Sequence, residues 1–337
     1  MKSILITGGA GFIGSNLIIH LLRTYPEYFI INLDKLTYAG NPDNLKEARD
    51  SRRYHFVHGD ICNRELVDYL LKNFDVHGIM HLAAESHVDN SIKGPEIFFR
   101  TNVQGTFTLL EAACSYWMEG PNRCRSGFEK RRFLHVSTDE VYGSLGETGL
   151  FTETTPYAPN SPYSASKAAS DMLVRSYFHT FGLNAVITNC SNNYGPRQHD
   201  EKLIPTIIRN ALKGQKIPIY GNGQNVRDWL YVLDHCRGMD LVFNKGESGE
   251  TYNIGGGNEW NNLSIARYIC SLLDVRRPRQ DGQSYLEQIS FVQDRPGHDQ
   301  RYGIDASKIE TRLGWQARES FKSGIEKTVD WYLEKYT

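Results

Sequence analysis

The sequence has no long apolar run, since none of its stretches approaches the roughly 20 consecutive residues that a membrane-spanning helix needs. Its net charge is −1, so it indicates neither a nucleic-acid footprint nor a polybasic membrane surface. The apolar run Ser3–Thr7 leads directly into glycines with no cleavage site after it, which gives no sign of an export leader. We therefore expect a cytoplasmic protein that binds neither membranes nor nucleic acid.

Cysteine pairs are also missing. The six cysteines are scattered over positions 62, 114, 124, 190, 236 and 270, with no C-x-x-C spacing. This pattern is typical of reduced thiols in a cytosolic protein and predicts no metal site. The chain has 15 Phe and 19 Tyr in 337 residues, so a core can form without disulfide or metal staples and disorder is excluded. No internal repeat occurs.

Short apolar runs alternate with amphipathic segments through the first half of the chain. Strands are expected at Ile4–Thr7, Phe29–Asp34, Tyr54–His58, Gly78–Ala83, Phe133–Ser137 and Ala185–Asn189. Helices are expected at Phe12–Leu22, Leu66–Phe74, Ile97–Trp117 and Pro162–Phe181. This alternation predicts an α/β fold with a Rossmann-type, doubly wound parallel sheet and right-handed crossovers.

The rhythm changes after Gly195-Pro196. Elements become shorter and Gly, Asn and Pro recur, which predicts a smaller α/β lobe rich in loops. The segment Glu119–Arg132 is rich in Arg and Lys, and we interpret it as a solvated loop.

The segment Thr7–Gly14 places glycines at 8, 11 and 14 between the first expected strand and the first helix. Such glycines serve a tight turn, close approach to a pyrophosphate and close packing of helix on strand, and the helix N-terminus offers free N–H groups. Asp34 ends the second strand at the spacing that a dinucleotide site requires. Its carboxylate would accept a hydrogen bond from a ribose 2′-OH and repel a 2′-phosphate, so we expect NAD rather than NADP. Lys35 weakens this preference, and Asp60 is a candidate adenine contact.

Tyr163 and Lys167 lie one helical turn apart and therefore on one face of an expected helix. A phenol with a pKa near 10 is a poor base at neutral pH. A nearby ammonium and a nicotinamide cation would stabilise the phenolate and lower that pKa. Together with the glycine loop, the pair indicates a site that moves a proton beside a dinucleotide.

Asp139 and Glu140 follow the fifth expected strand, at the edge of the sheet where sites of this fold are built. Two adjacent carboxylates have no obvious packing role there. A dehydration needs two such proton handlers, one base that removes a proton from carbon and one acid for the departing hydroxyl.

These motifs together resemble the extended short-chain dehydrogenase/reductase family. Within it, the sequence Ser-Thr-Asp-Glu-Val-Tyr-Gly at 137–143 is similar to the dTDP-glucose 4,6-dehydratases, and the likeness runs over nearly the whole chain. Other matching stretches are 33–41, 81–89, 190–196, 201–205, 226–231 and 294–298, of which the last three are specific to these dehydratases.

The resemblance implies a role for each residue of the two motifs. Tyr163 would act as the base at the sugar 4-OH, with Thr138 hydrogen-bonded to the same hydroxyl and Lys167 on the nicotinamide ribose. Glu140 would take the C5 proton and Asp139 would protonate the leaving 6-OH. Hydride would pass from C4 to NAD and return to C6, so that NAD stays bound and ends unchanged.

The resemblance also implies the binding residues and the assembly. Cofactor-binding residues would be Gly8, Gly11, Phe12, Ile13, Gly14, Asp34, Lys35, Thr37, Asp60, Ile61, Leu82, Ala83, Ala84, Ser86, Thr101, Tyr163, Lys167 and Asn193. Substrate-binding residues would be Ser86, Thr138, Asn192, Lys202, Leu203, Pro218, Tyr220, Arg227, Asn262, Arg295 and His298. Residues 1–194 with about 228–255 would bind NAD, and residues 195–227 with 256–337 would bind the nucleotide sugar. A homodimer would form through 97–117 and 162–181.

Two positions depart from the family pattern. Asn189 stands where Arg is expected and could loosen a buried polar network near the cofactor. Asp200 stands where Pro is usual and adds an anion near Lys202, which would weaken phosphate binding. Two other functions stay open: a nucleotide-sugar 4-epimerase, which would not need Asp139 and Glu140, and a non-catalytic NAD-sensing regulator.

Overall fold

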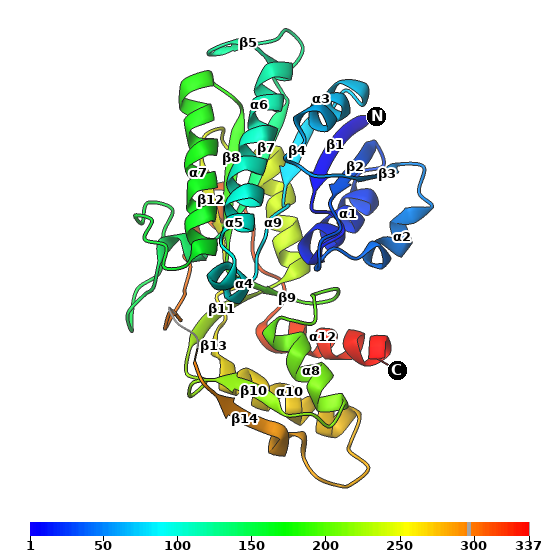
Figure 1. Ribbon diagram of the computed structural model, residues 1–337, viewed down its shortest axis with the longest axis vertical. Coiled ribbons are helices and arrows are strands. Elements are labelled where there is room, and N and C mark those ends of the chain that lie inside the picture. Colours follow the sequence, from blue (N-terminus) through cyan, green and yellow to red (C-terminus); the bar gives the residue numbers. More distant parts are fainter. Residues whose placement is uncertain (295–297, 337) are drawn as a thin grey trace.

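The computed structural model describes residues 1–294 and 298–336. Within them, seven parallel strands form one sheet in the order β12-β8-β7-β4-β1-β2-β3 (Figure 1). The strands are β1 (Lys2–Thr7), β2 (Tyr28–Asp34), β3 (Tyr54–His58), β4 (Gly78–His81), β7 (Arg132–Thr138), β8 (Ala185–Cys190) and β12 (Thr251–Ile254). The predicted Rossmann-type, doubly wound parallel sheet is therefore confirmed.

Helices cover both faces of this sheet because alternate side chains of its strands point to opposite sides. Ile4 and Ile6 of β1 join a core with α1 (Phe12–Thr24), α9 (Val232–Lys245) and α11 (Ser307–Leu313). Leu5 points to the other face and joins a core with α3 (Arg64–Asn73), α6 (Gly105–Trp117) and α7 (Pro162–Phe181). Thus α11, from the segment expected in the smaller lobe, packs on the large sheet through α9 and β12.

The helix expected at Ile97–Trp117 is interrupted. It starts as α5 (Glu96–Phe98), passes through a π-helical turn at Phe99–Gln104 and continues as α6. Such turns often occur at functional sites. Here the turn carries Asn102, whose side chain is hydrogen-bonded to the backbone of Glu85 and to Ser166.

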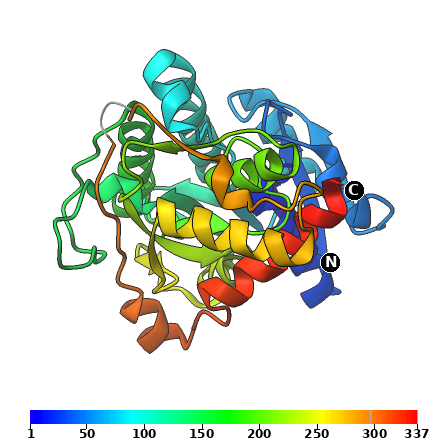
Figure 2. The same cartoon turned by 90° about the horizontal axis from the view of Figure 1, so that it is seen from below.

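The smaller lobe is more helical than its Gly, Asn and Pro content predicted. Its core forms between α8 (Leu203–Leu212), α10 (Asn262–Arg276) and α12 (Phe321–Tyr336), and Figure 2 shows α10 and α12 running side by side. Two small sheets complete it: β10 (Ile217–Tyr220) with β14 (Ile289–Val292), and β9 (Asn192–Tyr194), β11 (Val226–Tyr231) and β13 (Glu259–Asn261). The expectation of a loop-rich lobe is wrong, because apolar residues at helical spacing outweigh the turn residues between them.

The basic segment 119–132 is not simply a solvated loop. It contains a hairpin of β5 (Met118–Gly120) and β6 (Arg123–Cys124). Arg131 is buried: it donates to Val76 O and Asp75, and its guanidinium lies over the ring of Phe128. The prediction failed there because a planar guanidinium with such partners tolerates burial.

The remaining elements among the described residues are short. They are α2 (Lys46–Arg49), α4 (Val88–Lys93) and three turns of 3-10 helix at Pro42–Leu45, Asp139–Tyr142 and Tyr285–Gln288. All six cysteines are free thiols, as expected. Across 1–294 and 298–336, no helix is long and apolar enough to cross a membrane and no cluster of metal-ligating side chains occurs.

Candidate active site

A cleft of about 310 Å³ lies at the carboxyl ends of the large sheet. Loops after β1, β2, β3, β4, β7 and β8 line it, together with the start of α7 and the segment 198–202. All of the residues expected to bind the cofactor line this cleft, as do all five expected catalytic residues. The parallel order of the sheet explains this, because the carboxyl ends of its strands meet at one edge.

The three glycines of the first loop have different structural roles. Gly8 has a φ of +72°, and a Cβ there would lie 2.7 Å from the backbone of Ala83. A Cβ on Gly14 would lie 2.3 Å from Gly8 O, so Gly14 lets α1 pack against the loop. A Cβ on Gly11 would meet only Gly8 O, at 3.3 Å. Gly11 therefore leaves space at the N-terminus of α1, where a phosphate would be bound by free N–H groups.

Asp34 is buried at the end of β2 and joins two loops. One carboxylate oxygen accepts from Ala10 N and the other from Leu36 N, both at 2.8 Å. Burial raises the pKa of Asp34, and these two hydrogen bonds oppose the shift. Lys35 turns away from Asp34 and pairs with Asp60 at 2.8 Å. The ammonium that weakened the expectation of NAD is thus already matched by a carboxylate.

The start of α7 brings Tyr163 and Lys167 to the cleft. Ser161 caps the helix and forms a capping box with Ser164, and Pro162 occupies the first turn, where its missing N–H costs nothing. Tyr163 and Lys167 are 8% and 4% exposed. Lys167 Nζ donates to Val136 O at 2.8 Å.

Thr138 ends β7 and begins the 3-10 turn that carries the paired carboxylates. Its hydroxyl accepts from Glu140 N at 3.3 Å. Asp139 is 1% exposed, and its Oδ2 has no hydrogen-bond partner among the described residues. Burial, Glu140 and Asp228 hold the pKa of Asp139 well above its ordinary range. This direction favours the protonated form of Asp139, which is the form that a general acid needs.

The pKa of Tyr163 differs from the expectation. Burial and the neighbouring Glu140 raise it well above 10, and a hydrogen bond with Thr138 opposes the shift. The expected lowering by the Lys167 ammonium is not seen in the protein alone. The reason is that desolvation of a buried phenolate outweighs a single nearby cation.

The residues expected to bind the substrate divide into two sets. Ser86, Thr138, Asn192 and Lys202 line the cleft, and Lys202 Nζ donates to Ser86 O across it at 3.0 Å. Outside the cleft lining are Leu203, Pro218, Tyr220, Arg227, Asn262 and His298, and Arg295 lies outside the described residues.

Several members of the second set still gather near the cleft. The Tyr220 ring meets that of His298 edge to face, and the Tyr220 hydroxyl donates to Asp89 on α4 at 3.3 Å. The Arg227 guanidinium lies over the ring of Tyr302 and donates to the backbone of Asp299 and Gln300. Arg227 also lowers the pKa of Asp139, which indicates that its charge reaches the catalytic turn.

Sequence analysis missed several cleft residues. Glu85, Cys190 and Ser191 lie inside stretches that matched the family, so their position was a usable signal. Gln198 and His199 precede such a stretch, so the sequence contained no signal for them. The full set of additional lining residues is Leu33, Ala39, Gly40, Gly59, Glu85, Val136, Ser137, Cys190, Ser191, Gln198, His199 and Glu201.

The two departures from the family pattern have separate surroundings. Asn189 is buried in β8, where its amide donates to Tyr142 at 2.8 Å and more weakly to Tyr157 at 3.4 Å; its Oδ1 has no hydrogen-bond partner within the described chain. The Asp200 carboxylate accepts from Tyr336 at 2.7 Å and pairs with Lys335 on α12. Its carboxylate therefore contacts α12, and the expected weakening of phosphate binding at Lys202 stays a prediction.

Known proteins match this chain along its whole length. The family described as GDP-mannose 4,6 dehydratase matches residues 5–328. The chain is 54% identical to a dTDP-glucose 4,6-dehydratase of Xanthomonas campestris pv. campestris, over 100% of this chain and 95% of the relative. It is similar to the crystal structure of the dTDP-glucose 4,6-dehydratase of Streptomyces venezuelae with NAD bound, with a TM-score of 0.89, 46% identity and coverage of 99% and 97%.

A more distant structure is the UDP-glucose 4-epimerase of Thermotoga maritima, with a TM-score of 0.86, 26% identity and full coverage of both chains. The fold is thus shared with epimerases, whereas the sequence is much closer to the dehydratases. The chain belongs to the dTDP-glucose 4,6-dehydratase family, within the wider group of GDP-mannose 4,6 dehydratase-like proteins.

Proposed function

We propose that this protein converts dTDP-glucose to dTDP-4-keto-6-deoxyglucose and water, with NAD as a bound prosthetic group. The observation that carries the proposal is the pair Asp139 and Glu140 in the same cleft as Tyr163 and Lys167. Asp139 is buried, which raises its pKa, while Glu140 is adjacent and partly exposed. A 4-epimerase needs no second acid and base, and a regulator that only senses NAD needs none of the four residues.

The glycine loop, the N-terminus of α1 and Asp34 fit NAD. Gly11 leaves room for a pyrophosphate, and the Asp34 carboxylate lines the cleft where a ribose 2′-OH would donate to it. Held by these residues, NAD would supply a hydride acceptor for C4 and a hydride donor for C6.

The residues of the chain move the protons. Tyr163 accepts the proton of the 4-OH. Its ionised form would be favoured once the nicotinamide cation of NAD lies beside it together with the Lys167 ammonium. The new ketone makes the C5 proton acidic, and Glu140 removes it. Asp139 gives its proton to the departing 6-hydroxyl, which leaves as water. Lys202 and Arg227 bind the diphosphate and hold the sugar in place.

Incubation of the purified protein with dTDP-glucose tests this proposal. A 4-keto-6-deoxy product without added cofactor is expected, and nicotinamide should appear in the supernatant after denaturation. Formation of dTDP-galactose would support the epimerase instead. Absence of any product, with NAD still bound, would support the regulator.

We further propose that the protein is a cytoplasmic homodimer. Large apolar side chains are exposed on the interrupted helix and on α7, among them Phe99, Phe107 and Met172. Contiguous exposed apolar side chains of this kind mark interfaces, and two-fold symmetric pairs are the commonest assembly. The six free thiols fit a reducing compartment.

A further inference from the structure

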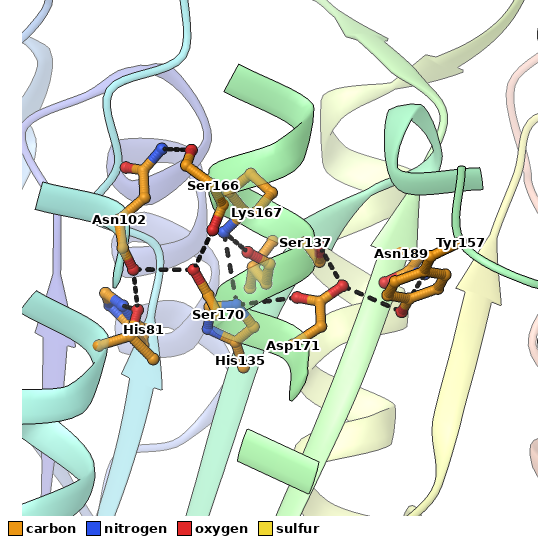
Figure 3. A network of polar contacts seen from close by, with 12 residues as sticks. His81, Asn102, His135, Ser137, Tyr157, Ser166, Lys167, Ser170, Asp171 and Asn189 are labelled. Atoms are coloured by element: carbon orange, nitrogen blue, oxygen red, sulfur yellow. Dashed lines mark hydrogen bonds and ion pairs between the residues drawn. The ribbon is translucent and has the colours of Figure 1, made fainter. Parts of the chain in front are cut away.

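Helix α7 carries three ionisable side chains at intervals of four residues. Tyr163, Lys167 and Asp171 therefore lie on one face of the helix, which packs against β7 and β8. The first two line the cleft, whereas Asp171 lies one turn further along, fully buried and away from the cleft. In Figure 3, His135 is in contact with both Lys167 and Asp171.

Lys167 needs a counter-charge in this position. Its Nζ donates to Val136 O at 2.8 Å and lies 3.5 Å from His135 Nε2, and both of these partners are neutral. Burial lowers the pKa of Lys167, and Asp171 makes the largest opposing contribution. A buried ammonium without a compensating charge loses its proton, so the carboxylate on the next turn decides whether Lys167 stays charged.

Asp171 is arranged to carry that charge. Its Oδ2 accepts from Ser137 at 2.8 Å and from Tyr157 at 3.0 Å. Its Oδ1 lies 3.1 Å from His135 Nε2, although the two atoms are not aligned as a hydrogen bond. The same ring nitrogen thus faces both charged groups, the Lys167 ammonium and the Asp171 carboxylate.

The histidine does not supply a second cation. Burial and the Lys167 charge hold the pKa of His135 well below its ordinary range, so its ring is neutral. The Lys167 ammonium and the Asp171 carboxylate therefore compensate each other inside the protein. Lys167 is also the cation that lowers the pKa of Asp171, which makes the dependence mutual.

We propose that Asp171 is a positioning residue for oxidation at C4, where its carboxylate keeps the Lys167 ammonium charged beside Tyr163. The proposal rests on the proposed function, in which Tyr163 and Lys167 act together on the 4-OH. Asp171 touches neither substrate nor cofactor and acts only through Lys167 and His135.

This arrangement predicts a pH dependence. Burial raises the pKa of Asp171 from 3.8 to about 6, against the opposing effects of Lys167, Ser137 and Tyr157. Asp171 becomes ionised as the pH rises through about 6, and Lys167 gains its counter-charge over the same range. The other titratable groups around the pair have pKa values that burial shifts away from this range; they are His81, His135, Tyr142, Tyr157 and Cys190.

Asp171→Asn tests the proposal, because asparagine keeps the shape but removes the charge. The rate of NADH formation after rapid mixing with dTDP-glucose is measured from about pH 5.5 to about pH 9. The wild-type rate should rise through about pH 6, and the variant should lack this rise. The variant should also lose rate at high pH, because each unit by which the Lys167 pKa falls reduces the protonated fraction about tenfold above that pKa.

Tyr157→Phe is the matched variant, since it keeps the carboxylate but removes a hydrogen bond that lowers the Asp171 pKa. The rise should move to higher pH in Tyr157→Phe and should not disappear. If Asp171→Asn does not fold, the comparison of Tyr157→Phe with the wild type is by itself the test of the proposal. A rise at the same pH as in the wild type, or an equal loss of rate by Asp171→Asn at every pH, would assign Asp171 a purely structural role and overturn the proposal.

A second measurement needs no catalysis. Between the unfolded pKa of 3.8 and the folded pKa of about 6, the native protein binds more protons than the unfolded chain. The wild type should therefore lose stability relative to Asp171→Asn as the pH rises through this window, and the difference should be constant above it. A wild-type protein that passes this test but yields no 4-keto product would refute the proposed function and leave the raised pKa of Asp171 standing. A flat difference would mean that Asp171 titrates at the same pH in the folded and the unfolded chain, and would refute the rise predicted near pH 6.

Discussion

The two walls of the cleft are built in different ways. The wall from the large sheet consists of residues that directly follow parallel strands, such as Asp34 after β2 and Thr138 after β7. The wall from the smaller lobe takes its residues from separate segments: Lys202 before α8 lines the cleft, whereas Arg227 on β11 and His298 lie outside its lining. The first wall needs only the order of the strands, whereas the second needs the lobe to pack correctly against the sheet.

Because of this difference, we expect the sheet wall to carry out the chemical steps and the lobe wall to bind the substrate. The sheet wall holds the expected acid, base and cofactor residues on buried elements whose hydrogen bonds fix them. The lobe wall touches the large domain through polar contacts at the rim, namely Lys202 with Ser86 and Tyr220 with Asp89. Changes in the sheet wall should therefore alter rate constants of single steps, and changes in the lobe wall should alter substrate affinity.

The largest effect should come from Glu140→Gln on the sheet wall. The substitution nearly preserves shape but removes the base at C5, so turnover should fall about 10²- to 10⁴-fold. Oxidation at C4 does not need Glu140, so enzyme-bound NADH absorbance should rise while exchange of the C5 proton with solvent deuterium stops. The exposed Glu147 provides the control, and Glu147→Gln should behave as the wild type. Near-normal turnover of Glu140→Gln would make the 4-epimerase the better assignment.

Asp139→Asn should separate the elimination from the steps before it. The variant loses the carboxyl group whose pKa burial and neighbouring carboxylates raise, so loss of the 6-OH should slow by about 10²-fold or more. Exchange at C5 through Glu140 should persist. Tyr163→Phe is the comparison here, because it should block NADH formation and exchange together. Loss of C5 exchange in Asp139→Asn would mean that the two carboxylates do not have separate roles.

Arg227→Lys should show the behaviour of the lobe wall. Lysine keeps the charge but loses the planar fork that binds a diphosphate with two parallel hydrogen bonds. Loss of a hydrogen bond to a charged group costs about 1.5–3 kcal/mol, so kcat/KM should fall about tenfold or more, mainly through KM. Arg209→Lys on α8 should leave both constants unchanged. A fall in kcat with unchanged KM would show that Arg227 acts on Asp139, whose pKa it lowers, and would remove the contrast between the walls.

The smallest effect on catalysis should come from Phe107→Glu. Phe107 is 46% exposed on α6, and a charge there should prevent pairing of the two helices with those of a second subunit. Light scattering at micromolar concentration should give a dimeric mass for the wild type and a monomeric mass for the variant, with most of the activity retained because both walls come from one chain. Val275→Glu, at an 83% exposed position of the smaller lobe, should remain dimeric. A monomeric wild type would refute the assembly.

Much of the sheet wall could be predicted from local patterns. Glycine spacing, the acid at 34 and the Tyr163–Lys167 spacing each lie within one strand-turn-helix unit, and the structure brings all of them to one cleft. The spacing did not predict that burial raises the pKa of Tyr163 in the protein alone, because spacing gives no measure of desolvation. The burial of Arg131 was missed because its partners, Val76 and Asp75, are more than 50 residues distant in sequence.

The sequence by itself determined the strand-helix order, the dinucleotide loop and the residues for which we propose catalytic roles. These depend on side-chain periodicity and on contacts within a few residues, which are local properties of a chain. Tertiary structure alone decided that the pKa of Asp139 is raised, that Asp200 contacts α12 and that Asp171 raises the pKa of Lys167. Burial and charge pairing depend on which distant segments meet, and the same carboxylate is an acid, a surface anion or a counter-ion according to what surrounds it.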